Sequence, residues 1–175
     1  LLPRTVAVFE DGQAAGFHRG AQLYVSHRGQ TLVDAALGES RLGVPMQPDT
    51  ITLWLSAGKP LTAVAIAQLQ DQGRLQFDDP VCRHVPEFAA GGKEAITLRH
   101  VLTHTGGFRD ADKIPENVGW DETVRRVCET PLEPGWIPGW QAGYHRSGSW
   151  FILGEVVRRL TGRPLGQYAR ERIFL

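Results

Sequence analysis

The chain has 175 residues, and its shares of hydrophobic residues (42%) and charged residues (22%) are ordinary for a globular protein. Lysine plus arginine and aspartate plus glutamate both total 19, so the formal net charge is zero and nucleic acid is not an expected partner. No run of about 18 apolar residues occurs, so we expect no membrane span. No signal peptide is visible, which leaves the cytoplasm and the periplasm both open.

The first 55 residues predict a helix followed by a β-hairpin. A short helix is expected within residues 3–17. Residues 20–27 and 31–36 have the composition of strands, and the Arg28-Gly29-Gln30 turn between them makes the pair an antiparallel hairpin. Two strands alone make a poor sheet, so we expect that the strands completing it are missing from these 175 residues.

Residues 56–175 predict an all-helical region. Apolar residues recur there at helical spacing, between capping residues and the glycines that end helices. The expected helices are residues 56–71, 97–104, 121–129, 149–160 and 165–173. Residues 131–143, rich in Pro, Gly and Trp, form a loop that is too long for a plain connector.

The most informative stretch is Ser56-Ala57-Gly58-Lys59. A serine and a lysine three residues apart lie on the same side of a helix, and Pro60 with the apolar run after it predicts that a helix starts here. A serine hydroxyl is a poor nucleophile unless a neighbouring base takes its proton, and a desolvated lysine can do so. Alone, this spacing arises by chance in many proteins, so other motifs must support it.

Further motifs follow in a characteristic order. They are Leu69-x-x-x-Gly73-x-Leu75-x-x-Asp78-Asp79-Pro80-Val81, Val85-Pro86-Glu87-Phe88, the block Ile96-Thr97-Leu98-Arg99-His100-Val101-Leu102-Thr103-His104-Thr105-Gly106-Gly107, then Tyr144, Leu153-Gly154-Glu155 and Thr161-Gly162-Arg163-Pro164. From about residue 20 to the end, the chain resembles the serine β-lactamase-related family, which includes class C β-lactamases, D-alanyl-D-alanine carboxypeptidases and family VIII-type esterases.

The resemblance implies an α+β fold of the β-lactamase and penicillin-binding-protein type. An antiparallel sheet with flanking helices would adjoin an all-helical region, with the active site in the cleft between them. Residues 1–55 would supply the N-terminal helix and hairpin, and residues 56–175 the nucleophile helix and the helical region. In this family, C-terminal strands close the sheet and carry a Lys-Thr-Gly or His-x-Gly motif. We expect these strands to be absent from this chain, so that a C-terminal segment of the same gene product is an expected partner.

The resemblance also assigns candidate site residues. Ser56 would be the acyl-accepting nucleophile, Lys59 the proton acceptor and Tyr144 a general acid or base. The family has a Tyr-x-Asn motif, whereas this chain reads Tyr144-His145-Arg146-Ser147. Arg146 takes the place of the asparagine, and Ser147 could reach the site if the loop has one extra residue. This change puts in doubt the recognition of a β-lactam or peptide carbonyl by a side-chain amide.

A loop with several tryptophans is expected to border the pocket, and one or two of Trp120, Trp136, Trp140 and Trp150 would line an apolar acyl site. Trp140 is our candidate. The alternative for each tryptophan is core packing.

Each candidate catalytic residue has a structural alternative. Ser56 could be a helix-capping serine, Lys59 a solvent-facing lysine, and Tyr144 a tyrosine that packs on Trp150. His104-Thr105-Gly106 looks like a His-x-Gly motif, but it closes a predicted helix instead of lying on a strand. We therefore expect a structural role for it near the cleft.

We expect a serine hydrolase that acts through an acyl-enzyme on a small ester or amide, with no cofactor and no metal. The alternative is a non-catalytic relative, or a cleaved fragment, that acts as a binding module of the same fold.

Overall fold

The computed structural model describes residues 2–114 and 117–175. The chain divides into two compact units, Leu1–Leu53 (unit 1) and Trp54–Leu175 (unit 2). The sequence predicts this division after residue 55, and the structure has it after Leu53.

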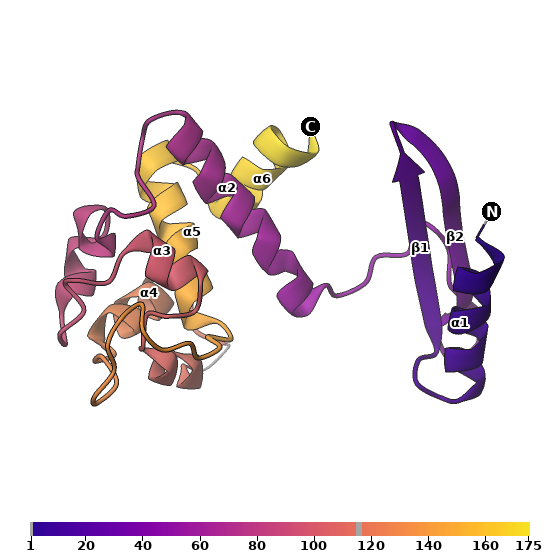
Figure 1. Ribbon diagram of the computed structural model, residues 1–175, viewed down its shortest axis with the longest axis horizontal. Helices are drawn as coiled ribbons and strands as arrows, with labels where there is room; N and C mark the ends of the chain where they lie inside the picture. The colour runs from indigo at the N-terminus through magenta and orange to yellow at the C-terminus, as the bar shows by residue number, and fades with distance from the viewer. Residues whose placement is uncertain (1, 115–116) are drawn as a thin grey trace. The chain divides into compact units, whose positions relative to one another are not determined.

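Unit 1 consists of one helix and a small antiparallel sheet (Figure 1). Helix α1 (Pro3–Ala14) begins with a proline in its first turn and contacts strand β2. The sheet has the order β1-β2-β3, with β1 at Gly20–His27, β2 at Gln30–Arg41 and β3 at Val44–Pro45.

The hairpin between β1 and β2 has the predicted turn, but β2 is longer than the predicted residues 31–36. Arg28 and Gly29 both have positive φ, at 50° and 79°, as a two-residue hairpin turn requires. The pairing continues as far as Gly20 with Gly38, and β2 then pairs with the short β3. None of residues 2–53 is buried.

The named elements of unit 2 are all helices in the part that the structure describes, apart from an isolated bridge between Pro80 and Thr97. Its helices are α2 (Lys59–Asp71), α3 (Leu98–Leu102), α4 (Trp120–Glu129), α5 (Gly148–Thr161) and α6 (Leu165–Ala169). Short 3₁₀ helices join them: η1 (Leu55–Gly58), η2 (Val81–Arg83), η3 (Pro86–Ala89) and η4 (Arg109–Lys113).

Helix α5 forms the centre of unit 2. It contacts α2, α3, α4 and α6, and Figure 1 shows α2 and α6 packed near it within this unit. The apolar side chains that it buries completely are Ile152, Leu153, Val156 and Val157. The helix ends at Gly162, whose φ of 72° is the left-handed conformation typical of a glycine after a helix.

Two helices differ from the sequence prediction by more than two residues at one end. The helix expected from Ser56 begins at Lys59, because Pro60 has no N–H to donate to the Ser56 carbonyl; the Lys59 N–H donates to it instead and closes a 3₁₀ turn. The helix expected over residues 165–173 is α-helical only to Ala169. It continues as a π-helix, η5 (Arg170–Phe174). There the Arg172 carbonyl accepts a hydrogen bond from the Gln68 side chain, and this contact with α2 accompanies the wider turn.

Candidate active site

Ser56 and Lys59 lie next to each other where η1 passes into α2. The Lys59 Nζ is 2.8 Å from the Ser56 Oγ. The 3₁₀ turn keeps the two residues on one side of the chain, because three residues complete one 3₁₀ turn. Ser56 is exposed, whereas Lys59 is half-buried and its Nζ lies 5.6 Å from the centre of the Trp150 ring. The structure therefore brings together the two residues that the Ser-x-x-Lys spacing singled out.

Tyr144 reaches the same serine from a distant part of the chain. Its phenolic OH donates to the Ser56 Oγ at 2.7 Å, across 88 residues of sequence. The Lys59 Nζ lies 5.2 Å from the centre of the Tyr144 ring. Ser56 Oγ is thus in hydrogen-bond contact with an amine and with a phenol, two groups that can accept its proton when they are in the basic form.

The loop before Tyr144 is fastened to the segment that follows α3. The Trp136 indole N–H donates to the Thr105 carbonyl at 3.0 Å, and its ring occupies the space beside Gly107. Gly107 has φ of 76°, and a Cβ there would lie 2.1 Å from the Trp136 ring, so only glycine fits. This contact accounts for the second glycine of the His104-Thr105-Gly106-Gly107 block.

An ion pair fastens the same loop at its beginning. Arg109 donates to the Glu133 carboxylate through Nε and Nη2, and the Arg109 backbone N–H donates to it as well. Hydrogen bonds from Arg109 hold the pKa of the Glu133 carboxyl below its usual value. The carboxylate therefore stays charged and keeps these hydrogen bonds at neutral pH.

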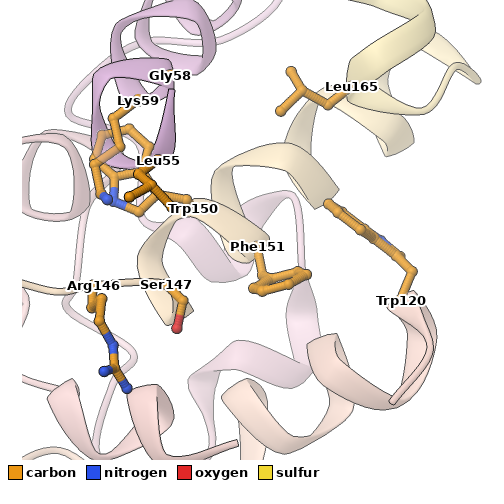
Figure 2. Close-up of a pocket in the computed structure, with 9 residues that line it drawn as sticks. All are labelled: Leu55, Gly58, Lys59, Trp120, Arg146, Ser147, Trp150, Phe151 and Leu165. Atoms are coloured by element: carbon orange, nitrogen blue, oxygen red, sulfur yellow. The ribbon is translucent and has the colours of Figure 1, made fainter. Parts of the chain in front are cut away.

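A pocket of about 320 Å³ opens beside Lys59. Figure 2 shows the Lys59 side chain next to the Trp150 ring, with Phe151 and Trp120 along another part of the wall. The Trp120 and Phe151 rings lie 5.2 Å apart. The residues that line the pocket are Leu55, Gly58, Lys59, Trp120, Arg146, Ser147, Trp150, Phe151 and Leu165. The wall is mainly apolar, with the polar side chains of Lys59, Arg146 and Ser147 on it.

The predicted substrate-binding residues have different positions. Arg146 and Ser147 line the pocket, whereas Trp140 does not, and its side chain is 85% exposed. The tryptophans on the pocket wall are Trp120 and Trp150. The sequence alone gives no reason to prefer these two tryptophans over Trp140. Which tryptophan lines the pocket depends on how α4 and α5 pack.

Neither a metal site nor a membrane helix is found in the described residues. Over residues 2–114 and 117–175, no group of three or more His, Cys, Asp or Glu side chains is arranged to hold a metal ion. Within the same ranges, no helix has both the length and the apolar character needed to cross a bilayer.

Comparison with known proteins shows the family. The β-lactamase family model matches residues 6–175, so the chain belongs to the β-lactamase family. Esterase EstB from Burkholderia gladioli is 33% identical over 94% of this chain and 47% of its own length. The esterase/β-lactamase LipL from Mycobacterium tuberculosis is 30% identical over 88% of this chain and 36% of its own length.

A solved structure shows the same fold. The penicillin-binding protein homologue from Caulobacter crescentus superposes with a TM-score of 0.81 at 34% identity, over 95% of this chain and 46% of that protein. The family and the α+β fold class predicted from the motifs are therefore confirmed. The chain spans about half the length of the curated relatives that it matches first.

Proposed function

We propose that this chain carries the nucleophile-bearing part of a serine hydrolase that acts through an acyl-enzyme on carboxylic esters or amides. The main support for this proposal is that the Lys59 and Tyr144 side chains both lie within hydrogen-bond distance of the Ser56 hydroxyl. Lys59 Nζ and Tyr144 OH lie 2.8 Å and 2.7 Å from Ser56 Oγ. The relatives named as an esterase and as an esterase/β-lactamase support this reaction class.

The reaction follows from this geometry. Ser56 Oγ attacks the carbonyl carbon of the substrate while its proton passes to the Lys59 amine or to the Tyr144 phenolate. The tetrahedral intermediate then collapses, the bond to the alcohol or amine leaving group breaks, and the leaving group takes that proton. Water next attacks the acyl-enzyme with the same residues as base, and the acid is released with Ser56 regenerated.

Esters with an apolar acyl group are the substrates that fit the site best. The pocket beside Lys59 offers aromatic walls from Trp120, Trp150 and Phe151, which suit an apolar acyl chain. By counting from Tyr144, Arg146 takes the place of the family's asparagine, and with one extra loop residue Ser147 would take it instead. Neither residue has the side-chain amide that would bind a peptide or β-lactam carbonyl. This replacement favours esters over amides.

We also propose that a C-terminal segment of the same gene product completes the site. None of residues 2–53 is buried, and the chain spans about half the length of its relatives. Such a segment would extend the sheet of unit 1 and supply a second donor to an oxyanion hole, whose first donor is the Ser56 backbone N–H. Loss of one oxyanion donor costs about a hundred- to a thousandfold in turnover.

Covalent labelling tests the nucleophile. The whole gene product is incubated with a fluorophosphonate probe, and the adduct is mapped by mass spectrometry. We expect the adduct on Ser56, no adduct in the Ser56→Ala variant, and hydrolysis of a p-nitrophenyl ester at least about a hundredfold slower in the Lys59→Ala variant. Lys113, an exposed lysine paired with Asp110, gives the matched control, because Lys113→Ala removes the same side chain elsewhere in unit 2.

Labelling at another residue would contradict the role of Ser56, and near-normal turnover in Lys59→Ala would return Lys59 to a structural role. The proposed C-terminal segment has a separate test, in which the 175-residue chain is compared with the whole gene product. If the shorter chain is monomeric, melts cooperatively and turns over the ester equally fast, no completing segment is needed.

A further inference from the structure

His104 contacts residues 143–145, the three consecutive residues around Tyr144 that we call the tyrosine loop. Its backbone carbonyl accepts a hydrogen bond from the Gly143 N–H at 2.9 Å. Its Nδ1 accepts one from the His145 N–H at 3.1 Å. Its ring lies against the Tyr144 ring, with the two ring centres 4.7 Å apart. One residue thus contacts Tyr144 itself and the residues on both sides of it.

The backbone of His104 is held in a conformation that needs support. Its φ is 60°, a left-handed conformation that costs energy for any residue with a Cβ. In that conformation the carbonyl points to Gly143 while the ring still reaches Tyr144 and His145. A strained backbone conformation of this kind persists only where surrounding contacts hold it in place. For His104, those contacts are with the tyrosine loop.

Tyr144 depends on contacts with other segments because neither regular secondary structure nor burial holds it in place. It lies in a segment without regular secondary structure, and its side chain is 56% exposed. Nevertheless its OH must stay within hydrogen-bond reach of Ser56 Oγ for a proton to pass. A displacement of about 1 Å can cost a hundredfold in rate, so the contacts that hold this loop bear directly on turnover.

We propose that His104 is a positioning residue that holds the Tyr144 phenol at Ser56 through the hydrogen bond that its Nδ1 accepts from the His145 N–H. This inference rests on the proposed function of Ser56 and Tyr144. The hydrogen bond also requires that Nδ1 carry no proton, because Nδ1 is the acceptor.

Two substitutions separate the hydrogen bond from the backbone conformation. His104→Gly suits a φ of 60° and removes both the acceptor and the ring. His104→Asn also tolerates this φ, and its Oδ1 can take the place of Nδ1 as acceptor, although the ring is lost. His84→Asn is the matched control, because it removes a half-buried histidine of unit 2 that bonds to Asp79 and not to the tyrosine loop.

Two measurements are made on the whole gene product: amide hydrogen exchange of the peptide that contains residues 143–145, and the rate of fluorophosphonate labelling. In His104→Gly we expect exchange at His145 to be at least about tenfold faster, and labelling to be about ten- to a hundredfold slower. In His104→Asn both should stay within about threefold of the wild type, and His84→Asn should change neither. Thermal melting checks that each variant is folded.

The proposal fails if folded His104→Gly keeps the protection of His145 and the labelling rate of the wild type. It also fails if His104→Asn is as impaired as His104→Gly, because the Nδ1 acceptor would then not be what holds the loop. If the wild type is not labelled at all but exchange at His145 is faster in His104→Gly, the proposed function is wrong. The conclusion that His104 positions the tyrosine loop would still be supported. A loss of labelling without faster exchange would contradict the positioning role.

Discussion

Unit 1 and unit 2 differ most in what they bury. Unit 2 has a continuous set of fully buried side chains that extends from Ala65 in α2 to Val157 in α5. In unit 1, none of residues 2–53 is buried, and Phe17 and Leu42 are among its most exposed apolar side chains. Unit 1 therefore gains less from the burial of apolar surface, which is the main favourable term in folding.

The candidate site follows the same division. Ser56, Lys59 and Tyr144 all belong to unit 2, where η1, α2 and the loop before α5 carry them. Unit 1 contributes a sheet whose strand β1 pairs only with β2 among the described residues. An unpaired strand edge with exposed apolar side chains can pair with a further strand. The candidate site thus lies in the unit that has the buried core.

The largest expected difference between the units is in amide hydrogen exchange of the 175-residue chain. Amides in the middle of α5 should exchange at least about a thousandfold more slowly, relative to their intrinsic rates, than amides in β1. The reason is that core helices open only with the whole unit, whereas a hairpin without buried residues opens locally. Mass spectrometry of peptides from Leu153–Val157 and from β1 measures this. Equal protection of the two would show that unit 1 is held as firmly as unit 2.

The next largest expected difference between the units is the loss in free energy of unfolding caused by a leucine-to-alanine substitution. Leu153 in α5 is fully buried, whereas Leu32 in β2 is 46% exposed. Leu153→Ala should lower the free energy of unfolding by about 3 kcal/mol, because it leaves a cavity in the core. Leu32→Ala should lower it by less than about 1 kcal/mol. Denaturant titration followed by circular dichroism measures both, and similar losses would contradict the difference in burial.

The smallest of the three effects concerns buried charge. The Glu155 side chain is fully buried and accepts hydrogen bonds from Trp120, Arg158 and Arg159. Burial raises the pKa of this carboxyl, but those hydrogen bonds outweigh it and the net pKa is about 2. A pKa below the ordinary 4.5 means that the stability from Glu155 is present above pH 4.5 and is lost as the pH falls towards 2.

Glu155→Gln should therefore be about 2 kcal/mol less stable than the wild type at pH 7, and this deficit should shrink between about pH 4.5 and 2. Glu39→Gln in β2 is the matched control, because Glu39 forms a 4.0 Å pair with Arg19 and both side chains are partly exposed. Its effect should be below about 0.5 kcal/mol at any pH. A pH-independent deficit in Glu155→Gln would mean that packing, not charge, explains its effect.

Local sequence signals predicted the parts of the fold that local chemistry controls. The Gly20–His27 strand and the turn at Arg28 both depend on neighbouring residues, and the structure has both of them. The approach of Lys59 to Ser56 was predictable for the same reason, since only a helical turn brings them together. The 3₁₀ form of that turn was not predicted, although the missing N–H of Pro60 was a usable signal.

Contacts between distant segments were beyond the reach of local signals. The motifs placed Tyr144 near Ser56 only through resemblance to a family, because nothing in residues 131–147 indicates which segment the loop packs on. The same limit explains the choice of Trp140, which is exposed, over Trp120 and Trp150. His104 was expected to have a structural role near the cleft, but its three contacts with residues 143–145 follow from tertiary packing alone.

The distance in sequence between Ser56 and Tyr144 also determines when the candidate site can assemble during biosynthesis. Lys59 joins Ser56 as soon as the first turn of α2 forms, whereas Tyr144 is synthesised 88 residues after Ser56. At ribosomal rates of about 5–20 residues per second, that separation corresponds to roughly 4–18 s. A nascent chain therefore carries its serine and lysine for several seconds before the phenol can reach them, and the three side chains come together only after Tyr144 has been synthesised.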